Sequence, residues 1–198
     1  SMTIISKYRK ILGLDSWHIN QVNRITQISF KKTNLVHCTT QKNPDIVPGM
    51  VSEDAGKFAL ESIVAATKDL KQGLIDAVVT APINKNTIQS PDFNFPGHTE
   101  YFTKEAGINE SLMMMVAPSM KVGVFTGHVP LSEVSSQITR DKIFTKVNLL
   151  LNTLKKDFNI QKPRVAVLGL NPHAGEEGML GNEEQQIIKP AIIEMKKK

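Results

Sequence analysis

The chain has 198 residues, 40% of them hydrophobic and 22% charged, with a formal net charge of +5, which is typical of a folded globular protein and excludes a disordered chain. The basic residues are scattered, with short clusters only at Lys31–Lys32 and Lys196–Lys198, so the charge does not indicate nucleic acid as a partner. No apolar run approaches the roughly 18 residues of a membrane span, so we expect no membrane partner. The positive charge instead suits a small anionic ligand such as a phosphate.

Cysteine usage indicates a reducing compartment. Cys38 is the single cysteine, so no internal disulfide can form, and no CxxC pattern surrounds it. The first residues lack the charged and then apolar pattern of a signal peptide. We therefore expect a cytoplasmic protein in which Cys38 is a packing residue.

The first clear pattern is a helix followed by a strand. Ser52 is a good N-cap residue, and Glu53 and Asp54 would lie in the first helical turn. Apolar residues then recur at helical spacing as far as Gly73, which is placed to end the helix. The apolar run Ile75–Thr80 predicts a buried strand.

The rest of the chain continues this alternation. In order we predict a short helix closed by Gly107, strands over Leu112–Ala117 and Lys121–Thr126, a long helix over Asp141–Phe158, a strand over Arg164–Leu170, and a helix from Asn182 with Glu183 and Glu184 at its positive end. Strands that alternate with helices indicate an α/β fold with a mainly parallel sheet flanked by helices. Ligand sites of such sheets lie in loops beyond the carboxyl ends of the strands.

Three histidines follow predicted strands. His98 lies in the loop region after the strand IDAVVT, His128 directly after KVGVFT, and His173 directly after RVAVLGL. A single loop histidine is usually a surface residue or a cap, but imidazole is also the commonest metal ligand and a titrating base. We therefore predict that the three histidines converge at the carboxyl ends of their strands. His18 and His37 lie outside this pattern and are interpreted as structural.

The glycine-rich loop between Gly169 and Gly181 contains GEEGMLG, which matches neither the GxGxxG fingerprint nor a Walker A motif. Its glycines permit a tight loop, and Glu176 is a candidate to reach a metal's second shell or a substrate hydroxyl. The run Met113–Met115 is interpreted as strand core rather than a redox or metal feature. No general base is assigned from the sequence.

Four segments in this order, TAPINKNTI, FPGHTEYF, FTGHVPLSEV and GLNPHAGEEGMLGNEE, closely resemble the 4-hydroxythreonine-4-phosphate dehydrogenase family of vitamin B6 (pyridoxal phosphate) biosynthesis. The resemblance implies an isocitrate/isopropylmalate dehydrogenase-like fold, a homodimer, NAD or NADP as cofactor, and a divalent cation (Zn, Mg, Mn or Co) at a site shared between subunits. By position, His98 and Thr99 match the family's substrate-binding pair. His128 and His173 match two of its three metal-binding histidines.

The resemblance covers only the central portion of a complete enzyme. Family members begin with a strand and a GDPAGIGPE-like turn, and they carry the third metal histidine in a YHDQG-like motif, but residues 1–198 contain neither motif. We therefore interpret residues 1–198 as a central portion, truncated at both ends, with parts of two subdomains. We expect this portion to be inactive alone and to bind divalent metal weakly, because two histidines leave a ligand shell incomplete.

The implied reaction is NAD(P)-dependent, metal-assisted oxidation and decarboxylation of 4-phosphohydroxy-L-threonine. A related dehydrogenase of four-carbon sugar-acid phosphates, such as threonate or erythronate phosphate, has similar motifs, and substrate assays would separate the two. A metal-dependent hydrolase using His128, His173 and a carboxylate would instead turn over without nicotinamide. A non-catalytic fragment that only self-associates is the remaining alternative.

Overall fold

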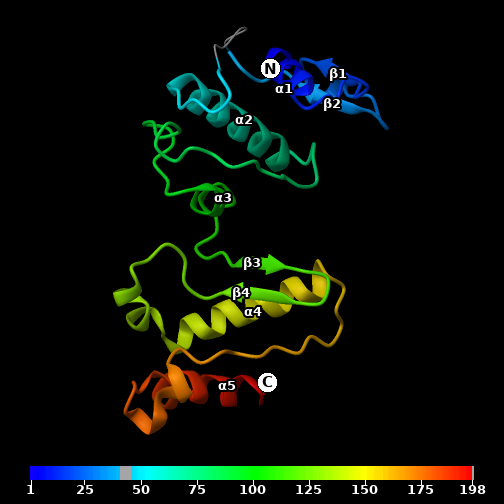
Figure 1. The fold of residues 1–198 in the computed structure, drawn as a ribbon. Helices are drawn as coiled ribbons and strands as arrows, with labels where there is room; N and C mark the ends of the chain where they lie inside the picture. The colour runs from blue at the N-terminus through cyan, green and yellow to red at the C-terminus, as the bar shows by residue number, and fades with distance from the viewer. Residues whose placement is uncertain (41–45, 198) are drawn as a thin grey trace. The chain divides into compact units, whose positions relative to one another are not determined.

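The computed structural model describes residues 1–40 and 46–197, and it divides into two compact units, Ser1–Gly107 and Ile108–Lys198. In chain order the elements are α1 (Met2–Ile11), β1 (Ile19–Val22), η1 (Ile25–Gln27), β2 (Thr33–Val36), α2 (Glu53–Lys71), α3 (His98–Glu105), β3 (Met113–Val116), β4 (Lys121–Val124), η2 (Leu131–Glu133), η3 (Ser135–Gln137), α4 (Arg140–Lys156), η4 (Pro172–Gly178), η5 (Glu184–Ile188) and α5 (Lys189–Met195) (Figure 1). Both units combine helices with strands, as an α/β protein does. Within the described residues, no helix is long and apolar enough to cross a membrane.

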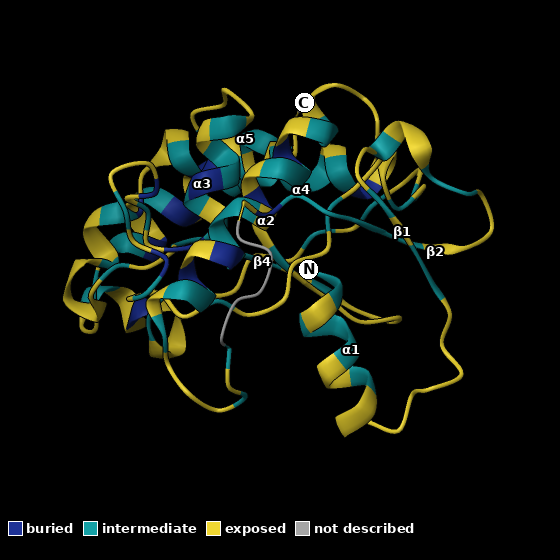
Figure 2. Cartoon of the chain, turned by 90° about the horizontal axis from the view of Figure 1, so that it is seen from above, coloured by how far each residue is buried: buried dark blue, intermediate teal, exposed yellow. Residues whose placement is uncertain are grey.

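The first unit opens with a helix and a small parallel sheet. Strands β1 and β2 pair in parallel, in a register that sets Ile19 opposite Thr33 and Val22 opposite Val36. Helix α1 has no buried residue, and Figure 2 shows it in the colours of intermediate and exposed residues throughout. This part of the unit therefore contributes little to the hydrophobic core.

The predicted helix after Ser52 is confirmed as α2. The Ser52 hydroxyl accepts a hydrogen bond from the backbone N–H of Ala55 at 3.2 Å, so it caps the helix as expected. Lys71 is the last residue of the helix, and Gly73 follows in the left-handed region with φ +68°. The predicted short helix is confirmed as α3, and Gly107 takes the same left-handed conformation after its end.

An aromatic cluster forms the core of the first unit. Phe93 is fully buried, and its ring centroid lies 5.3 Å from that of Phe95 and 5.2 Å from that of Tyr101 on α3. Ile63 of α2 and Ile88 complete the buried set. The segment that leads into α3 is therefore fixed by rings on both sides of it, because aromatic pairs of this geometry stabilise one another beyond the area they bury.

A second close contact joins α2 to the turn at Thr87. A Cβ atom built on Gly56 would lie 1.9 Å from the carbonyl oxygen of Thr87, which is backbone and cannot rotate away. Glycine at position 56 is therefore required for the helix to approach this turn.

In the second unit, the predicted strands LMMMVA and KVGVFT are confirmed as β3 and β4, which pair antiparallel with Met113 opposite Val124. Figure 1 shows α4 running along the hairpin. The interpretation of the methionine run as strand core is wrong, since Met115 is 66% exposed and Met113 is also exposed. A two-stranded hairpin buries only the face that packs on a helix, so alternate side chains of β3 remain in solvent.

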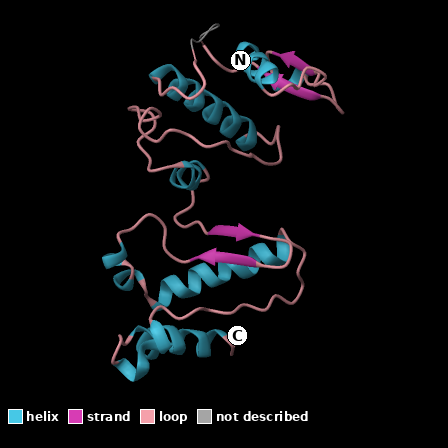
Figure 3. Cartoon of the chain, viewed as in Figure 1, coloured by secondary structure: helices cyan, strands magenta, loops and turns pink. Residues whose placement is uncertain are grey.

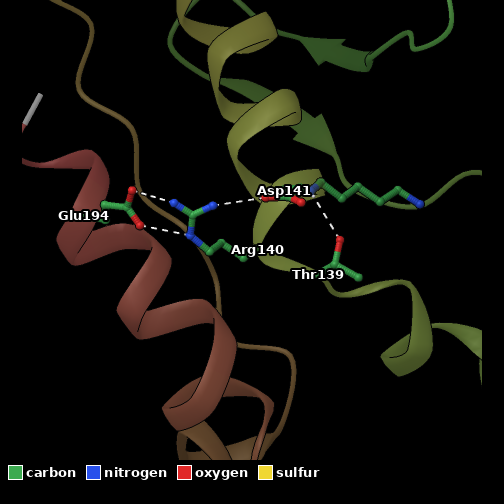
Figure 4. A network of polar contacts seen from close by, with 5 residues as sticks. Thr139, Arg140, Asp141 and Glu194 are labelled. Carbon is green, nitrogen blue, oxygen red and sulfur yellow. Dashed lines mark hydrogen bonds and ion pairs between the residues drawn. The ribbon is translucent and has the colours of Figure 1, made fainter.

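The predicted long helix is confirmed as α4, with Thr139 as its N-cap residue. Arg140 joins it to α5, since its Nε donates to Glu194 Oε2 at 2.9 Å and its Nη2 donates to Glu194 Oε1 at 2.5 Å (Figure 4). The pair is bidentate but exposed, so it orients the two helices more than it stabilises them. The core of the second unit is formed by four buried residues, Ile138, Ile143, Ile188 and Ala191.

Two predicted buried strands are absent. Residues 75–80 and 164–170 are extended but unpaired, and Figure 3 draws both as loop. Val79 is 98% exposed and Leu168 is 82% exposed, so neither run is buried. An apolar run becomes a strand only where a neighbouring strand supplies hydrogen-bond partners, and neither run finds one among the described residues. The sheets of the described residues are thus one parallel and one antiparallel pair, rather than the expected mainly parallel sheet.

The unpaired segment from Arg164 borders a groove in the second unit. The groove has a volume of ≈ 590 Å³ and is lined mainly by apolar side chains of β4, α4 and the segment 164–170. Lys146 reaches its wall from α4 and donates to the carbonyl oxygen of Ser111 at 2.5 Å. The segment therefore follows α4 without forming main-chain pairs with β4.

The predicted last helix is present but begins irregularly. Residues Glu184–Ile188 form one turn of π-helix, and α5 follows directly from Lys189. Pro190 has no N–H to donate to a carbonyl one turn earlier, which favours a wider turn before it.

We expect Gly56→Ala to destabilise the first unit. Overpacking against a rigid backbone typically costs about 1–3 kcal/mol, which exceeds the gain of up to about 1 kcal/mol from the better helix propensity of alanine. Urea unfolding followed by circular dichroism measures the change. Gly127→Ala is the matched control, because a Cβ there would meet open space. A Gly56→Ala protein as stable as the control would contradict the contact with Thr87.

Candidate functional site

In the first unit, two of the recognisable segments lie against each other. Asn84 Oδ1 accepts hydrogen bonds from two backbone N–H groups of its own turn, at 3.0 and 3.2 Å. Gln89 Nε2 donates to the carbonyl oxygen of Lys85 at 3.2 Å and to that of Phe95 at 2.8 Å. The TAPINK turn is therefore held beside the FPGHTEYF loop by the side-chain amide of Gln89, and this contact does not depend on the charged end of Lys85.

His98 is the first residue of α3, directly after the Pro96–Gly97 bend. Its ring stacks on Phe102, with centroids 6.1 Å apart and an interplanar angle of 11°. Its Nε2 atom is buried and has no hydrogen-bond partner among the described residues. A buried polar atom without a partner costs free energy, so this nitrogen marks a position where a ligand atom would be stabilised.

The N-terminus of α3 presents further polar groups beside His98. Gly97 is the N-cap residue and offers no side-chain acceptor, while Thr99 is exposed in the first turn. A Cβ built on Gly97 would lie 3.6 Å from Glu100 Oε2 and 4.0 Å from Lys85 Nζ. The turn thus combines the main-chain N–H groups of the first helical turn with one acidic and one basic side chain.

His128 lies four residues after the end of β4, in a tight turn of the second unit. The N–H of Val129 donates to the carbonyl oxygen of Gly127 at 2.9 Å, which makes His128 the central residue of a γ-turn. The residue is exposed. The backbone on both sides therefore holds the imidazole at the surface of the loop, as the glycine and proline beside it indicated.

His173 lies in an unusual left-handed turn. The residues from His173 to Glu177 all have positive φ, between 43° and 79°, and only Gly175 among them is glycine. His173 is exposed, as is Glu176. The role of Glu176 beside a metal stays a prediction.

A buried carboxylate holds the start of this loop. Glu184 is only 6% exposed, and its Oε1 accepts from the backbone N–H of Asn171 at 2.5 Å. Its Oε2 accepts from Asn171 Nδ2 at 3.0 Å, and Glu183 Oε2 accepts from the same nitrogen at 2.9 Å. The hydrogen bond from the backbone of Asn171 lowers the pKa of Glu184 from its ordinary value of 4.5, although burial acts in the opposite direction.

Sequence reasoning missed this pair of residues. It placed Glu183 and Glu184 at a helix N-terminus for their charge, and it gave Asn171 no role. The only signal was the position of Asn171 directly before the proline of NPHAG, since Asn there commonly begins a turn. Nothing in the spacing indicates that a carboxylate thirteen residues later would accept from it.

The two loop histidines of the second unit offer exposed imidazoles, a ligand type that suits Zn, Co or Mn. Two imidazoles do not complete a four-ligand site. No group of three His, Cys, Asp or Glu side chains able to hold a metal occurs in residues 1–40 and 46–197. His98 belongs to the other unit, and its convergence with His128 and His173 stays a prediction.

Comparison with known proteins identifies relatives along the whole chain. Residues 1–198 match the family model of pyridoxal phosphate biosynthetic protein PdxA. A 4-hydroxythreonine-4-phosphate dehydrogenase of Bacteroides thetaiotaomicron is 41% identical over 199 residues, which cover 100% of this chain and 54% of the relative. One from Sulfurihydrogenibium sp. is 36% identical over 192 residues, covering 97% of this chain and 58% of the relative. The chain thus spans little more than half the length of these relatives.

Solved structures agree with these matches. The crystal structure of 4-hydroxythreonine-4-phosphate dehydrogenase from Klebsiella pneumoniae matches with a TM-score of 0.79 at 29% identity, over 95% of this chain and 58% of that one. The structure of the enzyme of that name from Burkholderia phymatum matches with a TM-score of 0.73 at 30% identity, over 96% of this chain and 57% of that one.

We expect Glu184→Gln to change the dependence of stability on pH. The folded state lowers the pKa of Glu184 below 4.5, so the carboxylate contributes stability above that value and loses it as the pH falls through the folded pKa. Urea unfolding from neutral to acidic pH should therefore give a wild-type curve that declines more steeply below 4.5 than that of the variant. Glu177→Gln, on an exposed position of the same loop, is the control. Parallel acid limbs for wild type and Glu184→Gln would contradict the hydrogen bonds to Asn171.

Proposed function

Because the chain belongs to the pyridoxal phosphate biosynthetic protein PdxA family, we propose that it forms the central part of an NAD(P)-dependent, metal-assisted dehydrogenase of 4-phosphohydroxy-L-threonine. The observation that carries this proposal is the 41% identity along the entire chain to a relative named for this substrate. The absence of a spanning helix among the described residues and the free thiol of Cys38 are consistent with the cytoplasm as its compartment.

The substrate would meet the chain at the N-terminus of α3. The unpartnered Nε2 of His98 can exchange a hydrogen bond with a substrate oxygen, and the exposed hydroxyl of Thr99 can do the same. The main-chain donors of the first helical turn favour an anionic group, and Lys85 lies at the same turn. These features support a phosphorylated hydroxy acid as the ligand of this loop.

The reaction divides between cofactor, cation and protein. When bound, the nicotinamide would supply the hydride acceptor for oxidation of the secondary alcohol, whose proton would pass to a base that we do not assign, and the 3-oxo acid product would then lose CO₂. His128 and His173 would hold a divalent cation together with further ligands from outside the described residues, and the cation would supply Lewis-acid stabilisation of negative charge on the substrate oxygen. The chain's own part is to hold the substrate oxygens and two of the metal ligands in place.

We infer that the mainly parallel sheet and the cofactor site expected for this family include segments outside the described residues. We propose that the unpaired runs 75–80 and 164–170 become strands of a mainly parallel, isocitrate dehydrogenase-like sheet when the remaining half of the enzyme is present. Their exposed apolar side chains, such as Val79 and Leu168, support this proposal. For the same reason, we expect the 198-residue chain to show no activity in a dehydrogenase assay.

The outer side of the β3–β4 hairpin is a surface for a second copy of the chain. The exposed apolar side chains on the face that carries Met113 and Met115 are those two and Val122, which pairs with Met115. Methionine adapts to irregular apolar partners, and clustered exposed apolar residues commonly mark an interface. We therefore place the homodimer contact at this hairpin.

We predict that the chain alone produces no NADH or NADPH from 4-phosphohydroxy-L-threonine, whereas a chimera completed with the flanking segments of the Bacteroides relative does so. In the chimera, His128→Ala should abolish turnover with little loss of stability, because an exposed loop residue contributes little to the core. His18→Ala is the control, since His18 is exposed and lies outside the loops. Parallel assays with threonate and erythronate phosphates test the alternative substrates. Normal turnover of His128→Ala in metal-depleted buffer would overturn the mechanism.

We predict that Met115→Glu converts a dimer into a monomer, because a charge in an apolar contact must be desolvated without a partner. Sedimentation velocity at several protein concentrations measures the change. Met179→Glu places the same charge on another exposed methionine and should leave the dimer intact. A dimer that survives Met115→Glu but not Met179→Glu would move the interface away from the hairpin.

A further inference from the structure

The turn that carries His173 is strained. Its five residues of positive φ include His173, Ala174, Glu176 and Glu177, none of which is glycine. Left-handed conformation costs about 1–2 kcal/mol for each such residue. An isolated loop would relax to right-handed values, so contacts elsewhere in the fold must hold the turn in this form.

The contacts that hold it converge on Asn171, two residues before the histidine. The carboxylate of Glu184 accepts from both the backbone N–H and the side-chain nitrogen of Asn171. Glu183 accepts only from the side-chain nitrogen. Glu184 is therefore the residue that fixes the main chain at the entrance to the turn, and its position at the start of η5 ties that entrance to the core of the second unit.

Two glycines of the loop, Gly175 and Gly181, let the backbone approach the carboxylates of Glu183 and Glu184 closely. A Cβ on Gly175 would lie 2.4 Å from the carbonyl oxygen of Gly181 and 3.1 Å from Glu184 Oε2. A Cβ on Gly181 would lie 2.6 Å from Asn171 Nδ2 and 2.5 Å from Glu183 Oε2. The backbone N–H of Leu180 also donates to Gly175 at 3.0 Å. The turn is thus packed directly on the Glu184 carboxylate, with no room for a side chain between them.

We propose that Glu184 is the positioning residue for His173, and that it imposes the left-handed turn from which the imidazole is presented to a divalent cation. This inference rests on the proposed role of His173 as a metal ligand. Changing φ from positive to negative turns the Cα–Cβ bond of His173 to a different direction, so loss of Glu184 would leave the imidazole present but misdirected. The effect reaches the metal through Asn171 and the backbone, and Glu184 itself does not touch the cation.

The test uses the 198-residue chain and Co²⁺ as the probe. A strong NMR cross-peak between the N–H and Hα of one residue identifies left-handed φ, so wild type should show it at residues 173–177. Co²⁺ affinity is measured by optical titration, with His173→Ala defining the part that depends on His173. Glu184→Ala should lose the left-handed cross-peaks and weaken the His173-dependent affinity by about 10-fold to 100-fold, the usual effect of removing a residue that orients a ligand.

Two further variants separate positioning from a general loss of structure. Glu184→Gln retains one oxygen that can accept from the Asn171 N–H but sets a donor against Asn171 Nδ2, so it should restore part of the turn and of the affinity. Glu183→Ala leaves the hydrogen bond from the Asn171 N–H to Glu184 intact, so it should retain the left-handed turn and the His173-dependent Co²⁺ affinity. If circular dichroism shows that Glu184→Ala is unfolded, the positioning role is tested by comparing Glu184→Gln with Glu183→Ala.

The outcomes also separate this inference from the metal role of His173. Left-handed cross-peaks that persist in Glu184→Ala, or equal losses in Glu183→Ala, overturn the positioning role. The positioning role is also overturned if the turn relaxes in Glu184→Ala while the His173-dependent Co²⁺ affinity stays unchanged. If wild type shows no His173-dependent Co²⁺ binding, presentation of the imidazole to a cation is overturned together with the metal role, while the cross-peaks still decide whether Glu184 imposes the turn.

Discussion

An extended apolar run is stable in water only when neighbouring strands satisfy its backbone N–H and C=O groups. Strands β3 and β4 meet this requirement because a short connection lets them pair with each other, with Val116 opposite Lys121 next to the connecting turn. The runs 75–80 and 164–170 have the same composition but no partner among the described residues, and they remain extended and exposed. The helices between them do not share this dependence, since their backbone bonds are internal. The availability of strand partners therefore decides which apolar runs of the described residues form strands.

The same distinction explains what the sequence could predict. The helices were predictable because their signals are local: Ser52 caps α2, Gly73 follows its end, and the apolar stripe of α4 begins at Ile143. Strand pairing depends on residues far away in the chain, so a buried run and an unpaired run look alike in sequence. The loops with His128 and His173 were placed correctly because glycine and proline mark turns wherever they occur. The hydrogen bonds from Asn171 to Glu184 were not predictable, because they join two turns whose approach depends on the folded backbone.

The two candidate loops are fixed by different forces. The loop before His98 is held by apolar packing, with Phe93 and Tyr101 on either side of it, and the His98 Nε2 atom lacks a hydrogen-bond partner among the described residues. The loop of His173 is held by hydrogen bonds that Asn171 donates to the carboxylates of Glu183 and Glu184, and by close backbone contacts. Apolar packing tolerates small shifts of a side chain, whereas a charged hydrogen bond weakens steeply when its geometry changes. Under the proposed function, the second kind of support suits His173, because a metal ligand must keep its direction.

The choice of an amide to satisfy Glu183 and Glu184 has an electrostatic consequence. A lysine or arginine in place of Asn171 would satisfy the carboxylates equally well, but it would also neutralise charge, whereas the Asn171 amide leaves both negative charges in place. Among the described residues neither carboxylate forms an ion pair, so the second-unit loop keeps a negative potential close to His173. Solvent screens this potential beyond about 8 Å at physiological salt, and it therefore acts only on groups bound at the loop itself. There it favours a cation and disfavours an anion, whereas the main-chain N–H groups at the start of α3 favour an anion. Under the proposed function, charge would therefore place the cation at the loop of His173 and the phosphorylated end of the substrate at the start of α3.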